Sequence, residues 1–524
     1  NKSLDYTASG IWNYGSDFRF TTSVGAQYYH ETVHSVYAEG SVFPAAGLTS
    51  VSSTTQSRFN SEGFVEDKSL GVYAQEQVGW RDRMFFTAAL RSDDHSAFGS
   101  KFTRVTYPKY SLSWVLSEEP WFRVPVLSTQ LSELRLRVAY GESGKAPSTY
   151  SAIRTYTPAT GPANSAAVTP NSIGNPELGP EKGKEVEIGF DASGLQDRLG
   201  VEFTYYNKKT IDAILNKDLA PSTGQSGSQP INIGRIDNSG VELMLRGTPW
   251  RSERVGLDLT ASIATNDNEV SNLGLGMQYF VSAGQYLRHQ VGYPAFAWFE
   301  QKVLSTAMDR TTGLTSNTMC ADTLPGSGGR MGGLPRPCAG LNGVFGDADD
   351  APEVYLGRSV PPREFAFSGT LTLFNRFRVF SMIDMKDGHK KMDGNTRVRC
   401  GLFGRCKENF TTIVPEFAQQ ADSMWTAQAR SNSNLVDFLI TDASFAKWRE
   451  LTFAYDVPER YVRMARASRA TISVSGRNLA TWTDFIGFEP EAMFLGGSRG
   501  GNAAWEQSTL PQLRSWIVTF NLGF

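Results

Sequence analysis

The chain has 524 residues and a formal net charge of −2, and hydrophobic residues make up 40% of it. The absence of any run of about 20 apolar residues excludes a membrane-spanning α-helix, and the charge argues against an electrostatic nucleic-acid binder, which usually carries a basic patch. Glycine (50 residues) and aromatic residues (12%) are abundant, as expected for strands, turns and interfaces.

Strict alternation of apolar and polar residues recurs along the chain, as in the run Val255–Ile263. Successive side chains of a strand point to opposite faces, so this period of two predicts strands with one apolar and one polar face. The predicted strands number about fifteen and lie, in chain order, near 4–13, 17–30, 69–80, 83–93, 106–116, 133–141, 184–192, 199–209, 238–247, 254–265, 364–375, 377–386, 444–455, 470–478 and 515–524.

The predicted connections alternate between short and long. The short ones lie near 13–17, 80–83, 193–198, 248–254 and 374–378, with two longer turns near 117–132 and 456–469, the second expected to hold a small helix from Pro458. The long ones lie near 31–68, 142–183, 210–237, 266–363, 387–441 and 479–513. A soluble sandwich would show the same alternation within strands, but short turns on one side and long loops on the other are typical of outer-membrane barrels. The sequence therefore predicts an all-β fold, a transmembrane antiparallel β-barrel.

The strand count has a consequence for the domain organisation. The last strand must run inward to leave its C-terminus in the periplasm, and counting back makes the first strand run inward as well. Barrels that hold a plug close at about 22 strands, so this chain would open with about the eighth strand. We expect residues 1–524 to be the C-terminal portion of such a barrel, with the plug domain and first strands outside this chain. Its start, NKSLDYTASG, shows no signal peptide, as expected of a fragment or processed piece.

Four cysteines form two close pairs, Cys320 with Cys338 and Cys400 with Cys406. Zinc is the competing interpretation, but neither spacing is C-x₂-C, and His389, eleven residues before Cys400, is the one histidine near them. We predict two disulfides that staple two of the long loops, in an oxidising compartment.

The C-terminal segment carries five alternating apolar positions and ends in an aromatic residue. This pattern resembles the signal that barrel-assembly machinery recognises on outer-membrane proteins, although the last strand of a soluble sheet is the competing interpretation. The residues of the predicted signal are Trp516, Val518, Phe520, Leu522 and Phe524.

Six stretches, spread over nearly the whole chain, carry a resemblance to a known family. They are RVAYGESGKAP ending at Pro147, NPELGPEKGKEVEIGF (175–190), IDNSGVEL (236–243), VPPREF (360–365), SGRNLATWTDFIGFEPE (475–491) and LPQLRSW from Leu510. In these stretches the chain resembles the SusC/RagA branch of TonB-dependent outer-membrane transporters.

The resemblance implies a location in the outer membrane of a Gram-negative-type bacterium, in contact with its lipid. It also implies a periplasmic plug, a TonB-binding segment before that plug and, in many members, a SusD-like surface lipoprotein over the loops. Family members import glycans or peptides too large for porins, without bond-making chemistry or a cofactor. A passive porin-like channel or structural scaffold is the alternative, and the sequence does not identify a cargo.

Two enzyme-like patterns support a third hypothesis, an outer-membrane enzyme. His30, Glu31 and His34 fit H-E-x-x-H, but that zinc-protease motif works on a helix, whereas here it ends a predicted strand. The segment 496–500 fits G-x-S-x-G, but the hydrolase elbow needs a buried strand before it and a helix after it, and here the surroundings are a glycine-rich loop. We expect no catalytic site at either place.

Two sets of loop residues are candidates for binding. Asp347, Asp349 and Asp350 form a weak calcium candidate, because hard cations prefer clustered oxygen ligands; a solvated acidic loop is the competing interpretation. Aromatic rings in the long loops could stack on sugar rings or apolar peptide side chains, or belong to a membrane-interface girdle. The substrate candidates among them are Tyr150, Trp298, Tyr355, Trp425 and Trp505.

Overall fold

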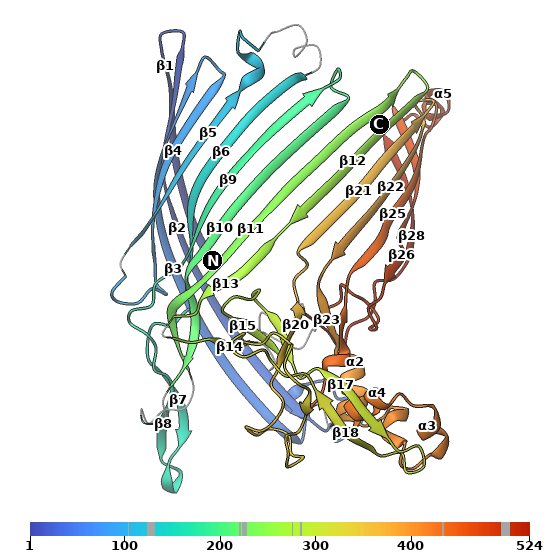
Figure 1. Cartoon of the computed structure of the whole chain (residues 1–524). Helices are drawn as coiled ribbons and strands as arrows, with labels where there is room; N and C mark the ends of the chain where they lie inside the picture. The colour runs from blue at the N-terminus through green and yellow to red at the C-terminus, as the bar shows by residue number, and fades with distance from the viewer. Residues whose placement is uncertain are drawn as a thin grey trace. The chain divides into compact units, whose positions relative to one another are not determined.

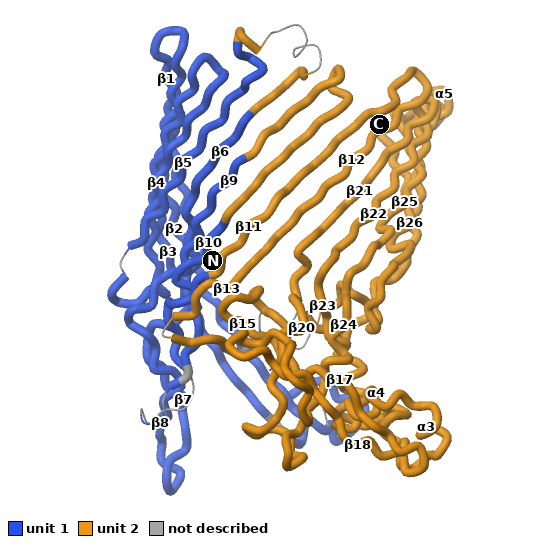
Figure 2. The backbone as a smooth tube through the Cα atoms, viewed as in Figure 1, with its two compact units in different colours: residues 1–119, 136–188, 208–235 blue, residues 120–135, 189–207, 236–524 orange. Residues whose placement is uncertain are grey.

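A computed structural model describes residues 1–102, 104–122, 131–219, 222, 228–274, 276–282, 286–431, 434–493 and 504–524. The chain divides into two compact units, coloured separately in Figure 2. Unit 1 comprises residues 1–119, 136–188 and 208–235, and unit 2 comprises residues 120–135, 189–207 and 236–524. In the described part of the chain, no helix is long and apolar enough to cross a membrane.

One large sheet holds most of the strands (Figure 1). Fifteen strands follow one another in it, and β13 (Asp267–Asn272) pairs beside them with β11. In sheet order they are β1 (Lys2–Tyr14), β2 (Phe18–Ser41), β3 (Gln56–Trp80), β4 (Met84–His95), β5 (Val105–Val115), β6 (Leu131–Lys145), β9 (Glu181–Gly194), β10 (Leu199–Asp218), β11 (Ser228–Arg251), β12 (Val255–Thr265), β21 (Arg363–Leu373), β22 (Phe377–Asp387), β25 (Phe445–Asp456), β26 (Arg469–Thr483) and β28 (Ser515–Gly523). Each predicted strand overlaps one of them, so the all-β, antiparallel prediction is confirmed.

Tight turns set the register of neighbouring strands at the short connections. Between β21 and β22, Phe374 and Asn375 both have positive φ (54° and 55°), and the N–H of Arg376 donates to the carbonyl of Leu373 at 3.0 Å. Positive φ at both central residues is the geometry of a type I′ turn, whose twist matches that of the flanking strands. The pairing then runs without a shift from Leu373↔Phe377 to Arg363↔Asp387.

The long connection predicted over 31–68 is wrong. β2 continues to Ser41 and β3 begins at Gln56, paired in register from Phe18↔Trp80 to Glu39↔Phe59. Beyond residue 30 polar residues occupy both faces, so the alternation that marks a strand with one apolar face fades although the backbone ladder continues. The connection over 210–237 is also shorter than predicted, because β10 reaches Asp218 and β11 starts at Ser228.

Two other connections contain regular structure. The connection between β6 and β9 holds a hairpin of β7 (Thr155–Thr160) and β8 (Ala166–Ser172). The small helix predicted from Pro458 is present as α5 (Glu459–Val462), followed by η8 (Arg463–Ala465). This helix prediction is therefore confirmed.

In unit 2 the three longest connections fold into small elements of their own, which we call the loop body: the described residues of 266–362, 388–444 and 484–514 (Figure 1). Its sheets consist of β14 (Tyr279–Ser282), β15 (Leu287–Gln290), β16 (Ala297–Glu300) and β20 (Val354–Arg358); of β17 (Val303–Met308), β18 (Thr315–Cys320) and β19 (Arg336–Pro337); and of β24 (Ile440–Asp442), β23 (Lys390–Asp393) and β27 (Trp505–Glu506). Its helices are α2 (Gly394–Thr396), η5 (Arg397–Leu402), η6 (Lys407–Phe410), α3 (Pro415–Gln420), α4 (Ser423–Arg430) and η7 (Asp437–Leu439).

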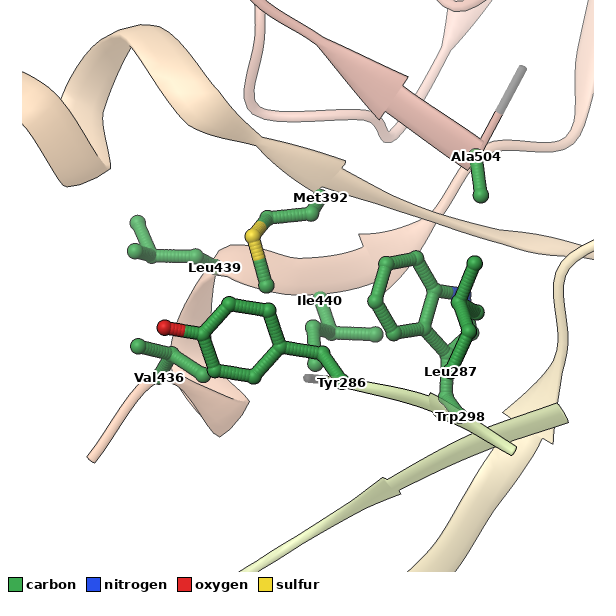
Figure 3. Packing of buried hydrophobic residues seen from close by; sticks show 8 residues of the cluster. All are labelled: Tyr286, Leu287, Trp298, Met392, Val436, Leu439, Ile440 and Ala504. Carbon is green, nitrogen blue, oxygen red and sulfur yellow. The ribbon is translucent and has the colours of Figure 1, made fainter. Parts of the chain in front are cut away.

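The loop body has a hydrophobic core drawn from all three connections. Figure 3 shows its members, Tyr286, Leu287, Trp298, Met392, Val436, Leu439, Ile440 and Ala504. Leu287, Trp298 and Met392 are completely buried. Burying such side chains contributes about 1.5–3 kcal/mol each, so the three connections stabilise one another rather than forming independent loops.

Candidate functional site

Both predicted disulfides are present in the loop body. Cys320–Cys338 joins the end of β18 to the residue that follows β19, within a buried cluster that includes Val303 and Leu435. Cys400–Cys406 joins η5 to the residue that precedes η6 and packs against Ala429 of α4. The two bridges therefore fix loop segments against buried elements of the loop body.

The aromatic candidates have different surroundings. Trp298 is fully buried, and its Nε1 donates to the backbone oxygen of Lys390 at 2.9 Å. The expectation that its ring faces a substrate is therefore wrong: this indole is a core residue that holds β16 against β23. Sequence alone could not show this, because its partners lie about ninety residues away along the chain.

The other four candidates keep part of their surface accessible. Tyr355 packs against Tyr293 with ring centroids 5.0 Å apart, and Trp505 lies 5.5 Å from Tyr286. In unit 1, the hydroxyl of Tyr150 accepts a hydrogen bond from the backbone N–H of Glu66 at 3.1 Å. Their roles in substrate contact stay predictions.

Trp425 differs from these because it lines a cavity. The cavity has a volume of about 460 Å³ and lies among β17, η6, α4 and η7. Its lining residues are Lys302, Val303, Lys407, Glu408, Gln420, Asp422, Met424, Trp425, Gln428, Asp437 and Phe438. The indole meets the ring of Phe438 edge-on, with centroids 4.1 Å apart. A volume of this size is within the range of small-ligand sites.

A buried ionic network holds the segment that follows β26. The ammonium of Lys447 contacts the carboxylates of Glu489 and Glu491, the latter at 2.8 Å. Arg449 forms paired hydrogen bonds to Glu491 and to Asp384 of β22. Lys447 and Glu489 are 2% and 5% exposed, and buried charges persist only when paired and hydrogen-bonded.

A third cation, Lys391 of β23, binds backbone oxygens of the same segment. Its Nζ donates to the carbonyl oxygens of Pro490 and Ala492 at 2.7 and 2.6 Å. Burial lowers the pKa of Lys391 to about 8, against the opposing effect of nearby carboxylates led by Glu506. We call Lys391, Lys447, Arg449, Glu489 and Glu491 the clamp. The motif around Glu489 and Glu491 was recognisable in the sequence, but its cationic partners were not.

Glu506 anchors the same segment from β27. Its carboxylate accepts hydrogen bonds from the backbone N–H of Phe488 at 3.0 and 3.2 Å. The side chain is completely buried, and burial raises the pKa of Glu506 to about 7, although the bond from Phe488 favours the ionised form. The carboxyl therefore changes protonation near neutral pH.

The acidic calcium candidate is compact. One oxygen from each of Asp347, Asp349 and Asp350 lies within 4.8 Å of the others. These carboxylates also serve the turn itself: Asp349 accepts from the N–H of Leu341 at 2.8 Å, and Asp347 accepts from the amide of Asn342 at 2.6 Å. The arrangement is compatible with a cation and equally with a turn that satisfies its own donors, so calcium stays a prediction.

The two enzyme-like motifs have different outcomes. His30 and His34 lie within β2, where each histidine pairs with a glutamate of β3: His30 with Glu66 at 2.8 Å and His34 with Glu62 at 2.6 Å. These histidines are strand residues in cross-strand pairs, without the helical geometry that H-E-x-x-H chemistry requires. The G-x-S-x-G segment, 496–500, lies outside the described residues.

Four of the C-terminal candidates lie on β28, which pairs with β26 from Arg469↔Gly523 to Arg477↔Ser515, and Phe524 follows directly after it. All five side chains are strongly exposed, from 56% for Leu522 to 88% for Phe524. An exposed apolar face is what a strand facing lipid requires. The residues of the predicted assembly signal are therefore exposed at the end of the chain. Their recognition by assembly machinery stays a prediction.

Comparison with known proteins identifies the family. The family model described as "TonB dependent receptor-like, beta-barrel" matches residues 1–316, more than half of the chain. This chain belongs to that family. Family members are receptors and transporters of the outer membrane of Gram-negative bacteria.

Relatives of this TonB-dependent receptor chain agree with the predicted SusC/RagA branch. "TonB-dependent receptor P26" of Formosa agariphila is 25% identical, over 97% of this chain and 52% of the relative. "TonB-dependent receptor SusC" of Bacteroides thetaiotaomicron is 27% identical over 42% of this chain and 23% of the relative. The chain thus spans about half the length of TonB-dependent receptor P26.

Solved structures share the fold of this receptor chain. The RagAB peptide transporter matches 100% of this chain and 55% of its own chain, with a TM-score of 0.80 and 18% identity. The RagAB peptide importer in its "open-open" state matches with a TM-score of 0.78 and 19% identity. At such identities the likeness concerns the fold, and cargo does not transfer with it.

Proposed function

We propose that this chain supplies the wall and the extracellular loops of an importer that moves an oligomeric nutrient, a glycan or a peptide, across the outer membrane. The observation that carries the proposal is the combination of a receptor-family sheet with a loop body that is packed, disulfide-linked and clamped. A passive pore needs only an open lumen, whereas selective capture needs a preorganised binding surface.

The proposal includes the rest of the protein and its partners. TonB would act through a plug portion in the part of the protein that this chain does not cover, in keeping with residues 1–524 as the C-terminal barrel portion. A SusD-like surface lipoprotein would close over the loop body. The names of the relatives, TonB-dependent receptors and SusC, support this assembly. The names of the RagAB structures support a peptide as one cargo class.

Native mass spectrometry of the protein extracted by detergent from its own membranes tests the assembly. Peptide identification of each component should find a plug-containing portion and a surface lipoprotein together with this chain. A particle that contains this chain alone, at 57.7 kDa, would contradict coupled import and favour an open channel or scaffold.

A further inference from the structure

The short connection between β25 and β26 carries an arginine at every third position: Arg460, Arg463, Arg466 and Arg469. We call residues 458–469 the arginine turn. It contains one acidic residue, Glu459, and no lysine, so its formal charge is 4 − 1 = +3, whereas the whole chain carries −2. The positive charge is therefore concentrated in this one connection.

The fold anchors the arginine turn at the end of the sheet and leaves its arginines in solvent. Val462 and Ala467 are buried, at 3% and 6% exposure. The N–H of Ser468 donates to the carbonyl of Gly523 at 2.7 Å, which places the turn beside the end of β28 (Figure 1). All four arginines are exposed. In helical turns, residues three apart are neighbours on the surface, so the arginines that start from α5 and η8 lie close together.

The protein itself neutralises little of this charge. Arg463 pairs with Glu459 at 2.8 Å, but the two side chains are 78% and 75% exposed, and such exposed pairs are weak. Asp456, the nearest acid before the turn, is already paired with Arg378 at 3.0 Å. Among the described residues, Arg466 has no acidic partner. The guanidinium groups are thus available to an external anion.

Apolar side chains are exposed beside these arginines. Tyr461 is 51% exposed and Met464 is 82% exposed, and the guanidinium of Arg460 lies 4.6 Å from the ring centroid of Tyr461. The neighbouring strand ends expose Phe377 of β22 and Phe524 after β28. Exposed aromatic residues at strand ends mark the membrane–water interface of a barrel. The arginine turn therefore lies where the lipid-facing strands end.

This combination selects the class of partner. The charge requires an anion, and the planar fork of a guanidinium matches two oxygens of a phosphate. A soluble anion would leave Tyr461 and Met464 uncovered, whereas a phosphate that carries acyl chains satisfies the arginines and covers the apolar side chains. Clusters of arginine next to a membrane are typical binders of anionic lipids.

We propose that the arginine turn binds the phosphate headgroups of anionic phospholipids in the membrane leaflet that it faces. Arg463 and Arg466 contact the phosphate oxygens, and Tyr461 and Met464 lie against the glycerol and the first part of the acyl chains. The inference depends on neither the cargo nor TonB, so it goes beyond the proposed function. These contacts would hold this end of the sheet at a fixed depth in the membrane.

Hydrogen exchange on the complete protein in lipid nanodiscs tests the proposal. One nanodisc contains phosphatidylcholine alone, and the other contains phosphatidylglycerol and phosphatidylcholine in equal parts with the same acyl chains. Residues 459–467 should exchange more slowly with phosphatidylglycerol. Equal exchange in the two nanodiscs would overturn the proposal. Equal protection in phosphatidylcholine by added inorganic phosphate or by poly-glutamate would also overturn it, and would assign the turn to a free anion or to an acidic protein.

Substitutions test which arginines act. Native mass spectrometry of the complete detergent-purified protein, titrated with phosphatidylglycerol, measures lipid affinity. Arg463→Gln with Arg466→Gln should weaken binding about 25-fold, since each arginine near an anionic surface contributes about fivefold. Arg463→Lys with Arg466→Lys keeps the charge and should retain most of the binding.

The matched control removes two exposed arginines beside another short turn, Arg251→Gln with Arg254→Gln. Phosphatidylglycerol binding should stay nearly unchanged in this variant. An equal loss in both glutamine variants would indicate general attraction to the charge of the whole protein and would overturn the site. No loss in Arg463→Gln with Arg466→Gln would overturn it as well.

Discussion

Lys447 is almost completely buried, and its ammonium lies between two carboxylates of the segment that follows β26. The desolvation of such a cation is offset only while both partners remain in place. At the scale of single residues, this clamp is what gives an irregular segment a fixed position. The residues of the clamp come from three segments that are far apart in the sequence, so no local sequence pattern predicts it.

Lys447→Met should release the clamped segment. Removing the cation leaves the buried carboxylate of Glu489 without its ammonium partner, while Glu491 keeps Arg449, and breaking a buried pair in this way costs about 3–5 kcal/mol. Hydrogen exchange of residues 485–492 should accelerate accordingly. Lys386→Met is the matched control, because its pair with Glu364 at 3.2 Å is solvent-exposed and exposed pairs contribute about 0–1 kcal/mol. Equal effects of the two substitutions would contradict the clamp.

Glu506 predicts a pH dependence for the same segment. Its folded pKa of about 7 lies above the ordinary value of 4.5, so the stability that the neutral carboxyl contributes is complete below pH 4.5 and is lost as the pH rises through 7. Raising the pH from 5 to 8 should destabilise the packing around Phe488 by about 2–3 kcal/mol. Glu506→Gln, which stays neutral, should remove this dependence. Hydrogen exchange around Phe488, corrected for intrinsic exchange rates, measures this pH dependence. Identical pH profiles for the unchanged protein and for Glu506→Gln would contradict the prediction.

The acidic turn yields a prediction about calcium. If Asp347, Asp349 and Asp350 bind the ion, calcium at about 1 mM should slow proteolysis of residues 340–350, since extracellular calcium sites work near 10⁻⁴–10⁻³ M. Asp349→Asn should abolish the protection, and Asp322→Asn, outside the turn, should preserve it. Cleavage at the same rate with calcium and with chelator would contradict calcium binding. The turn would then be an acidic loop that satisfies its own hydrogen-bond donors.

At the scale of elements, each disulfide closes a different segment of the loop body. Cys320→Ser with Cys338→Ser opens a span of 18 residues and should cost about 3 kcal/mol, as expected for a loop of about 15 residues. Cys400→Ser with Cys406→Ser opens a span of 6 residues and should cost less. Hydrogen-exchange protection of β18 and β19 tests the first pair. Unchanged protection there would contradict the proposed role of Cys320–Cys338 as a staple.

The strands of the large sheet were predictable and the elements of the loop body were not. A strand with one apolar face can be recognised from the local alternation of apolar and polar residues. This alternation predicted all fifteen strands and the short connection that holds the tight turn at Phe374 and Asn375. The extensions of β2 and β3 were missed because polar residues occupy both of their faces. In the loop body, β23 pairs with β27 more than a hundred residues later, so its short strands depend on contacts that no local period encodes.

The candidate site was predictable only in part, for a similar reason. The members of each cysteine pair are close in sequence, and both predicted disulfides are present. Glu489 and Glu491 lie in a stretch that was noted for its family resemblance, without a predicted contact. Whether a loop tryptophan is fully buried or stays partly accessible depends on tertiary packing, which distinguishes Trp298 from Trp425. The burial of Glu408 and Gln428 has no sequence signal either, since it comes from the packing of η6 and α4.

At the scale of the whole molecule, the relatives that this chain matches are longer than the chain itself. The chain belongs to the TonB-dependent receptor family and spans about half the length of the relative TonB-dependent receptor P26. In the proposed importer, energy coupling would reside in the plug portion and selection would reside in the loop body. Import would then depend on TonB and on the loop body independently.

Uptake of labelled oligomers by cells that carry the complete transporter tests this central claim most directly. The measurement compares neutral oligosaccharides and peptides in cells with TonB, in cells without TonB, and in cells treated with a protonophore. We predict saturable uptake of at least one oligomer that is abolished when TonB or the proton gradient is removed. Uptake that is unsaturable and unchanged without TonB would contradict it and would make the chain part of a passive channel.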